Sequence, residues 1–488
     1  MKKLKLLILL IGSLFLFNGC DTGLDPQIYD QLNPTTYPSN AKEAELYALE
    51  VYYPFTSRWP TENYQIFGLE EGHIQQFDAP TDVMTQFTEW GGFFQDYSRA
   101  NYDNFTSYDR RRSHLEYIRF VTETTKIIDD LQNLDVFANE EERNQLLGEV
   151  RMARGWIMYY MLHLYGPVPV ILDPAKIGTE AEADMTRPSR GEYVNAIAND
   201  LRFAADNLAV DAPDYGRFNK GLALTALMRL YLNEQDFQNA EDIGREIQAM
   251  NKYSLIDDYM SLFTESTERN SETIWAISAT GSSTGRGNEG NFNAYSYYTL
   301  PSDFEAPGVT PGWSSPNAVF MATWDFYDSF DPSDERREQL VESYGSRDRT
   351  NLRGAVIFKY PGPGGFTGAD IPIARFADVK LMLAESINEN NGGPTQEAID
   401  HVNDVRNRAG LGDLPPEDTQ SMEAFNDAIL EERGKEFLFE GLRKFDLVRH
   451  GEWPDRVETI EGKTPTSTPL LPIPQWATQD GMAQNEGY

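Results

Sequence analysis

Two segments that lie far apart in the sequence carry aromatic side chains next to glycine, proline and polar residues. Trp90 precedes Gly91 and Gly92, and Trp313 follows a Pro-Gly pair. The flat face of Trp or Tyr packs favourably on the C–H face of a pyranose ring, while neighbouring polar groups bind its hydroxyls. Rings and polar groups of this kind are therefore candidates for a platform that binds a ligand such as a sugar, and the candidate residues are Trp90, Trp313, Tyr295, Tyr297, Tyr298, Asp78, Arg99 and Asn101. The alternative is that some of these rings are core residues.

The motifs that could carry catalysis are weak. Residues 281–285 match the G-x-S-x-G pattern of serine hydrolases, and residues 273–279 before them could form the required strand. Residues 286–291 are rich in Gly and Asn, which is typical of a loop and not of the helix that this motif needs. The five histidines lack metal-binding spacing, and no phosphate-binding loop of Walker type occurs. We predict no catalytic residue, no metal and no cofactor.

Residues 431–446 form the densest group of charges. Two carboxylates at a suitable separation in space would be able to hydrolyse a glycosidic bond. The acids of this segment alternate with Arg433, Lys435 and Arg443 at the spacing of one helical turn, which is typical of a helix stabilised by ion pairs. We therefore interpret the segment as structural.

The overall charge restricts the class of ligand. Lys and Arg total 42 against 77 Asp and Glu, and the net charge is -35. Nucleic-acid binding needs a basic surface, and this charge opposes the long-range attraction of a polyanion. The composition is consistent with a neutral ligand.

The first residues have the pattern of an exported protein. Lysines precede an apolar run over residues 6–17, which is too short for a transmembrane helix. We predict that residues 1–19 are a lipoprotein signal peptide and that Cys20, the only cysteine, is acylated after cleavage. The alternative is an ordinary cleavage site beside a stray cysteine. Residues 20–40, which contain many Pro, Thr and Asn, are predicted to form the lipidated tether.

Helical periodicity begins after this tether. Asn40 is predicted to cap a helix, with Glu43 as its partner. Apolar stripes predict two further helices over 118–134 and 146–164. Gly166 and the two prolines after it should end the latter helix and force an extended exit.

Paired helices are predicted in two later parts of the chain. After a helix over 193–208, residues 221–233 and 237–250 form a helix-turn-helix unit of the tetratricopeptide type. A second unit covers residues 376–409. We expect such hairpins to stack into a scaffold.

Between these units, residues 280–316 have a different composition. They are rich in Gly, Ser and Asn, yet they also carry several large aromatic side chains. A long irregular segment of this kind is either a packed insertion or a binding surface.

Several motifs occur in an order that resembles the SusD/RagB family of nutrient-binding outer-membrane lipoproteins. Tyr165-Gly166-Pro167-Val168-Pro169 resembles the family's YGxVP exit, and residues 432–449 resemble its ERxxEFxFEGxRxFDLxR stretch. Glu486 in place of a usual Pro and His450 in place of a common aromatic are small departures away from the expected site. The other matching segments are 148–154, 375–385, 403–410, 471–474 and 484–488.

The resemblance implies a mainly α fold, in which a tetratricopeptide-like helical hairpin scaffold carries an irregular, loop-rich ligand-binding lobe. It also implies binding of an oligosaccharide or polysaccharide without catalysis, and a SusC-like TonB-dependent transporter as partner. The lipid-anchored chain would then lie in the outer membrane at the cell surface. On this basis we divide the folded chain into an N-terminal helical region, 41–270, and a C-terminal region, 271–488.

Two other functions remain open at this point. One is a peptide-binding RagB-type lipoprotein, because part of the family is associated with peptides, and the other is an anchored glycoside hydrolase. Exposed flat rings with few charges would favour sugar binding, whereas a deep cleft with paired carboxylates would favour hydrolysis.

Overall fold

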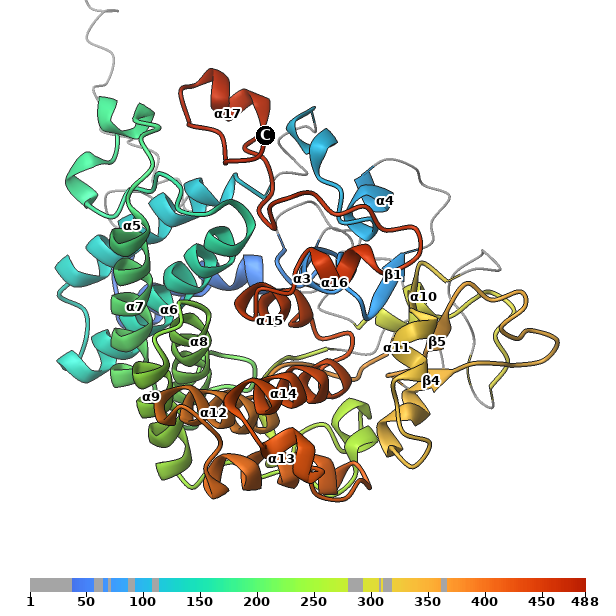
Figure 1. The fold of residues 1–488 in the computed structure, drawn as a ribbon. Coiled ribbons are helices and arrows are strands. Elements are labelled where there is room, and N and C mark those ends of the chain that lie inside the picture. The colour runs from blue at the N-terminus through green and yellow to red at the C-terminus, as the bar shows by residue number, and fades with distance from the viewer. Residues whose placement is uncertain are drawn as a thin grey trace, which may run out of the picture.

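The computed structural model describes residues 37–56, 65–68, 72–86, 93–107, 114–279, 293–306, 309, 318–360 and 367–488. The fold is mainly α-helical, as predicted, and the strands within the described ranges are short (Figure 1). Cys20, Trp90, Trp313 and residues 281–285 lie outside the described residues, so the expectations for them stay predictions.

The α-helices differ widely in length, from one turn to seven turns. In chain order they are α2 Ala41–Ala48, α3 His73–Phe77, α4 Phe93–Ser98, α5 Tyr117–Asn133, α6 Glu140–Tyr165, α7 Arg190–Asn207, α8 Lys220–Asn233, α9 Phe237–Ala249, α10 Tyr295–Thr299, α11 Trp324–Asp328, α12 Phe376–Asn391, α13 Gln396–Arg408, α14 Met422–Glu436, α15 Arg443–Arg449, α16 Asp455–Glu458 and α17 Gln475–Gln479.

The long helices stack in chain order. α5 packs on α6, α6 on α7, α7 on α8 and α8 on α9, after which α9 packs on α12, and α12 contacts α13 and α14. We call α5–α9 with α12–α14 the scaffold, which occupies the left and the bottom of Figure 1. The two predicted hairpins are confirmed as α8/α9 and α12/α13. Because α9 contacts α12, the stack continues across the predicted division at residue 270.

The helix starts in the scaffold follow local sequence signals. Ser189 and Glu192 form a complete capping box at α7. The predicted Asn40 cap of α2 is confirmed, because its side chain accepts a 3.0 Å hydrogen bond from the Glu43 amide. The Glu43 carboxylate accepts a hydrogen bond from the Ser39 amide at 2.7 Å, in place of the Asn40 amide that a capping box would use. Beyond Ala48 the chain tightens into a 3-10 helix, Leu49–Phe55.

The end of α6 is fixed from a distant part of the chain. Gly166 adopts a φ of 75°, which favours glycine, and its amide bonds to the Leu162 carbonyl. The Arg187 guanidinium donates to the carbonyls of Tyr165 at 2.6 Å and Pro167 at 2.7 Å, and to the Asn485 side chain at 2.7 Å. The Tyr-Gly-Pro exit and the C-terminal residues therefore meet at one arginine.

The strands form two small sheets. One sheet has the order β1-β3-β5-β4, and the other pairs β2 with β6. All of the pairs are antiparallel. We call the four-stranded sheet, together with α4 and α10, the lobe, which lies at the right of Figure 1. The strands are β1 Met84–Gln86, β2 Thr273–Ile277, β3 Phe320–Ala322, β4 Leu340–Val341, β5 Ala355–Ile357 and β6 Ile371–Arg375.

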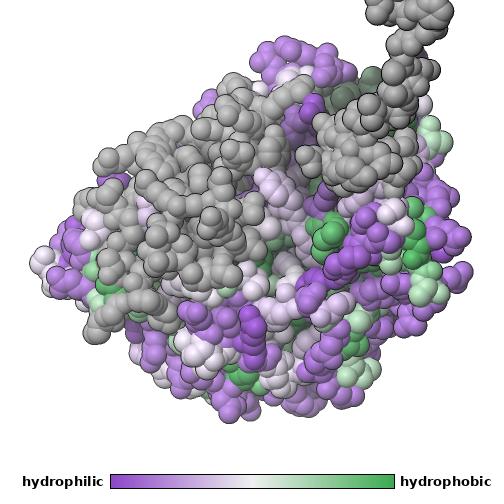
Figure 2. Space-filling model, turned by 180° about the vertical axis from the view of Figure 1, so that it is seen from behind, coloured by the Kyte–Doolittle hydropathy of each residue, from purple (hydrophilic) through white to green (hydrophobic). Residues whose placement is uncertain are grey.

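Among the described residues, the surface seen from behind is mainly hydrophilic, and its apolar residues form small separate patches (Figure 2). This agrees with the strongly acidic composition. Within the described ranges, no helix combines the length and the apolar composition needed to cross a membrane.

Candidate functional site

The lobe pairs two strands that lead into the two segments predicted to share one site. β1 pairs with β3 in antiparallel register, with Gln86 opposite Phe320. The chain leaves β1 at Gln86 toward Trp90, and it enters β3 at Phe320 from the side of Trp313. The two connections therefore begin at the same end of one strand pair, although they are more than 200 residues apart in sequence.

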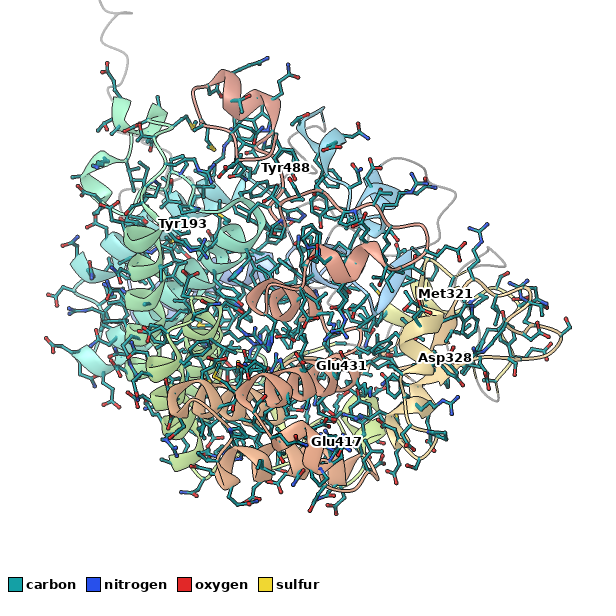
Figure 3. All side chains as sticks on the ribbon, viewed as in Figure 1. Tyr193, Met321, Asp328, Glu417, Glu431 and Tyr488 are labelled. Atoms are coloured by element: carbon teal, nitrogen blue, oxygen red, sulfur yellow. The ribbon has the colours of Figure 1, made fainter. Side chains whose placement is uncertain are left out.

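The predicted tyrosines lie on α10, next to the same strands. The Val319 amide, just before β3, donates a 2.8 Å hydrogen bond to the Tyr298 carbonyl. α10 packs against β3 and β5. In Figure 3, Met321 marks β3 within this sheet, and Glu431 marks α14 of the scaffold nearby.

The rings of these tyrosines face inward. Tyr295 and Tyr298 are each 1% exposed, and Tyr297 is 9% exposed. The Tyr295 hydroxyl lies 3.3 Å from His73 Nε2, and its ring makes edge contacts with Tyr360 and Phe439. Of the two alternatives given for the 280–316 segment, a packed insertion or a binding surface, the described part therefore fits the packed insertion. Ligand contact by these three rings stays a prediction, and their burial favours a role in the core.

Asp78, another predicted ligand residue, is fully buried at 0% exposure. Its carboxylate accepts hydrogen bonds from the amides of Gly441 at 2.8 Å and Arg443 at 3.2 Å. Burial raises the pKa of Asp78 to about 7, although these two amides act in the opposite direction. In this conformation Asp78 holds the turn before α15, so the geometry favours a structural role.

Arg99 and Asn101 differ from Asp78, because both reach the surface. Arg99 is exposed and Asn101 is half-buried. Among the described residues, Arg99 is bound through its backbone, where its carbonyl accepts a 2.8 Å hydrogen bond from the Thr464 amide. The Asn101 side chain accepts from the Asp103 amide at 3.2 Å. Both residues follow α4, the helix that comes directly after the connection with Trp90 in the chain.

The C-terminal part of the chain fixes the segments on both sides of that connection. Lys463 is buried and donates from Nζ to the carbonyls of Ala79 at 2.5 Å, Met84 at 2.8 Å and Ser98 at 2.8 Å. Burial lowers the pKa of Lys463 to about 7, whereas the three carbonyl oxygens favour the charged form. Sequence reasoning missed Lys463, because no motif distinguishes it from a surface lysine.

The charged run 431–446 forms ion pairs between elements, as its structural interpretation requires. Glu436 lies 2.9 Å from Arg375 and 3.0 Å from Arg336, and it also pairs with Arg408. Glu432 pairs with Arg336 at 2.6 Å. Burial alone would raise the pKa of Glu436, but the three arginines hold it well below its usual range. We call these five residues the junction network.

The partners of this network differ from the sequence expectation in one respect. The expected pairs were local, with one helical turn between them, but the arginines that bind Glu436 come from outside α14. Arg375 ends β6, and Arg408 ends α13. Each carboxylate is thus held by a cation, an arrangement that stabilises the fold and leaves no paired acid free for hydrolysis among these residues.

The described residues contain no group of three or more His, Cys, Asp or Glu side chains arranged to hold a metal ion. The described histidines make ring contacts or polar contacts with neighbouring side chains instead. His73, for example, lies in the lobe core against Phe67 and Tyr295.

Family comparison matches two separate parts of the chain. A family model described as "SusD family" matches residues 358–488, and a second, described as "Starch-binding associating with outer membrane", matches residues 68–232. The chain belongs to the SusD family. Among its SusD relatives, "SusD-like protein P25" of Formosa agariphila is 27% identical over 418 residues, which are 76% of this chain and 78% of that protein.

A second SusD relative is "Starch-binding protein SusD" of Bacteroides thetaiotaomicron. It is 22% identical over 459 residues, which cover 78% of this chain and 79% of that protein.

Solved SusD structures share the fold. A SusD homologue of Bacteroides thetaiotaomicron superposes with a TM-score of 0.77 at 20% identity, over 93% of this chain and 98% of that chain. A structure described as "Laminarin binding SusD-like protein" gives a TM-score of 0.74 at 23% identity, over 92% of this chain and 99% of that chain. The Bacteroides thetaiotaomicron surface glycan-binding protein A in complex with laminarihexaose gives a TM-score of 0.74 at 18% identity, over 92% of this chain and 99% of that chain.

Proposed function

We propose that this SusD-family protein is a cell-surface lipoprotein that binds neutral oligosaccharides and passes them to a SusC-like TonB-dependent transporter. The names of its relatives support this, because they include a starch-binding and a laminarin-binding protein. The net charge of -35 supports a neutral ligand over an anionic one.

The pairing of β1 with β3 is the observation that carries the proposal. Trp90 is four residues beyond Gln86, and Trp313 is seven residues before Phe320. An extended chain spans at most about 3.5 Å per residue, so chain length alone keeps the Cα atoms of both tryptophans within about 25 Å of one strand end. A platform for several sugar units has dimensions of this order.

Polar groups beside this strand end support sugar binding. The exposed Arg99 side chain and the half-buried Asn101 amide follow α4, on the far side of the same connection. Both side chains are able to donate hydrogen bonds to sugar hydroxyls. These hydrogen bonds would fix the orientation of the sugar on the faces of the two tryptophans. The buried Tyr295 and Tyr298 would position the insertion and not touch the ligand.

Two tryptophan variants test the proposal. Stacking that removes on the order of 80 Å² of apolar surface contributes about 2 kcal/mol, so Trp90→Ala and Trp313→Ala should each weaken binding roughly thirtyfold. Calorimetry against a panel of neutral and acidic polysaccharides, with laminarihexaose among the probes, measures the affinity. Thermal melts of both variants control for folding.

The outcomes of that experiment separate the alternatives. Unchanged affinity in both variants would place the site elsewhere. A lowered melting temperature with unchanged affinity would mark the rings as core. Tight binding of peptides and not of glycans, lost in the same variants, would favour the RagB-type alternative.

The proposal also includes binding without turnover. The carboxylates of the junction network are held by arginines, which opposes their use as a general acid or a nucleophile. Release of new reducing ends from a bound glycan, above that of a boiled control and lost on substitution of one carboxylate, would contradict this.

The anchor is tested separately. Cys20→Ala should release a folded protein from the outer-membrane fraction, because the acyl chains supply the membrane affinity. If the variant remained in that fraction in cells without the transporter, the lipid assignment would be wrong.

A further inference from the structure

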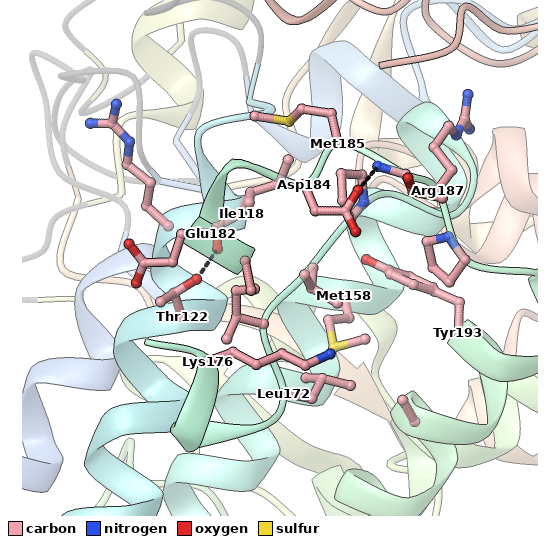
Figure 4. Close-up of a pocket in the computed structure, with 18 of the residues that line it drawn as sticks. Ile118, Thr122, Met158, Leu172, Lys176, Glu182, Asp184, Met185, Arg187 and Tyr193 are labelled. Carbon is pink, nitrogen blue, oxygen red and sulfur yellow. Dashed lines mark hydrogen bonds between the residues drawn. The ribbon is translucent and has the colours of Figure 1, made fainter. Parts of the chain in front are cut away.

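A cavity lies on the scaffold and is built by different residues from those of the proposed glycan site. It has a volume of about 920 Å³, within the range of known ligand sites. Its walls are α5, α6 and α7, the connection over residues 169–189 and one face of α17 (Figure 4). We call it the scaffold cavity.

The floor of the scaffold cavity is aliphatic. Ile118, Met158, Leu172 and Met185 line it, and Met158 is fully buried within α6. Thioether and branched aliphatic side chains adapt to a flexible apolar chain. These four side chains do not present the flat faces on which sugar rings stack, so the floor suits an apolar side chain of a peptide, while Trp476 and Tyr193 add aromatic rings to the lining.

The charges around the cavity are mostly negative. Seven acidic side chains and three basic ones line it. Arg187 is turned away and donates to backbone carbonyls and Asn485, while Arg119 pairs with Glu116 at 3.2 Å. The other six acids make no ion pair with a described residue, and they are Glu123, Asp173, Glu182, Asp184, Glu192 and Asp480.

Buried polar chemistry also points into the cavity. The Tyr193 side chain is 1% exposed, and its hydroxyl has no hydrogen-bond partner among the described residues. Figure 4 shows this hydroxyl directed toward the space between Met158 and Asp184. A buried hydroxyl without a partner is unfavourable, and a ligand oxygen at this point would satisfy it.

We propose that the scaffold cavity binds a peptide segment of a partner protein that carries a Lys or Arg side chain between apolar side chains. The aliphatic stem of the basic side chain would lie along Met158 and Met185, and its cation would reach Asp184 and Glu182. A backbone carbonyl of the segment would accept the hydrogen bond of Tyr193. This site is independent of the proposed glycan function, since none of its lining residues belongs to the lobe.

The probe is a fluorescently labelled peptide, acetyl-Ala-Leu-Lys-Leu-Ala-amide, with Glu in place of Lys as the comparison peptide. Fluorescence anisotropy is measured as the full chain in detergent is added to each peptide. The Lys peptide should bind at least tenfold more tightly than the Glu peptide, and this difference in affinity should decrease as salt is added. No binding of the Lys peptide up to millimolar concentration, or equal binding of both peptides, would overturn the proposal.

Variants locate the binding within the cavity. The double substitution Glu182→Lys with Asp184→Lys should weaken binding of the Lys peptide at least tenfold. The control is Asp135→Lys, at an exposed acid outside the cavity, which should leave this affinity unchanged. Lys176→Ala removes a competing cation at the rim and should strengthen binding about twofold. Equal weakening by the Asp135 control would mean that only the overall charge is sensed, and the proposal would fail.

Tyr193→Phe separates ligand binding from stability. It should weaken binding of the Lys peptide by about threefold to tenfold. The melting temperature should stay the same or rise, because the removed hydroxyl has no hydrogen-bond partner among the described residues. A lowered melting temperature with unchanged affinity would assign Tyr193 to the core. Binding that appears only after Arg110, Arg111 and Arg112 are changed to Ser would mean that this basic run of the chain itself is the occupant, and would overturn the partner proposal.

Discussion

The scaffold and the lobe are stabilised by different kinds of contact. In the scaffold, each long helix packs on the next one in the chain, and the contacts come from apolar stripes and small residues at the crossings. At Gly244 in α9 an added Cβ would lie 2.7 Å from the Met228 side chain of α8, so the helices approach closely there. These contacts are mostly local in sequence.

The lobe depends on residues hundreds of positions away. Its strands are only two or three residues long, which is too short for a sheet to be stable alone. Asp78, Asp82 and the carbonyls around Lys463 instead bind the C-terminal segment, 361 to 384 residues later. The lesson is that local periodicity builds the frame, while buried polar contacts over long sequence distances position the proposed binding loops.

The largest expected effect lies in the junction network. Glu436→Gln leaves the charges of Arg336, Arg375 and Arg408 without their shared partner in a buried place, which should cost about 3–5 kcal/mol in the free energy of unfolding. Urea denaturation measures it. The control is Arg245→Gln, which breaks an exposed pair with Glu397 and should cost under about 1 kcal/mol. Similar losses in the two variants would mean that burial does not distinguish the pairs.

Lys463→Met tests the polar clamp of the lobe. Three carbonyls would lose their shared donor, so we expect a loss of about 2–3 kcal/mol in stability. Because the clamp holds both sides of the connection with Trp90, glycan affinity should fall as well. Lys42→Met, at an exposed lysine of α2, is the control for both measurements. Full glycan affinity in a destabilised Lys463→Met protein would separate the clamp from the binding site.

His73 gives the lobe core a pH dependence. Burial, together with nearby Arg229, lowers the pKa of His73 to about 3, and Tyr295 is its hydrogen-bond partner. The unfolded state takes up a proton near pH 6.5, whereas the folded state does not, so stability present above pH 6.5 is lost as the pH falls toward 3.

Between pH 6.5 and 4.5 this loss should be about 2 kcal/mol, and His73→Phe should remove it from the pH profile of unfolding. The window lies above the range in which Glu436 would be protonated, because the pKa of that carboxyl is lowered. If the free energy of unfolding depends on pH in the variant as it does in the unchanged protein, His73 carries a proton in the folded state.

The smallest effect is expected for a helix cap in the scaffold. Ser189→Ala removes one half of the capping box at α7 and should cost about 1 kcal/mol. Thermal unfolding measures the change, and glycan affinity should stay the same because Ser189 caps a scaffold helix and, among the described residues, its side chain hydrogen-bonds to Glu192 of that helix and not to the lobe. A larger loss than that of Lys463→Met would reverse the contrast between the two regions.

The sequence by itself determined the elements whose information is local. The Asn40 cap, the α8/α9 and α12/α13 hairpins and the end of α6 at Gly166 all follow from spacing and residue type, and the structure contains each of them. The family motifs could be assigned for the same reason, since each is a contiguous stretch. The pairing of two remote aromatic segments could be expected only through the family resemblance.

Only the tertiary structure decided which polar and aromatic groups are buried. Tyr295 and Tyr298 face the core and Asp78 holds a turn, although the same residue types would suit a binding surface. Glu436 takes its arginines from β6, α13 and the 335–339 turn, and Lys463 reaches three carbonyls of the lobe. These contacts join residues that no periodicity relates, and burial depends on how the whole chain packs, so spacing along the sequence carries no information about them.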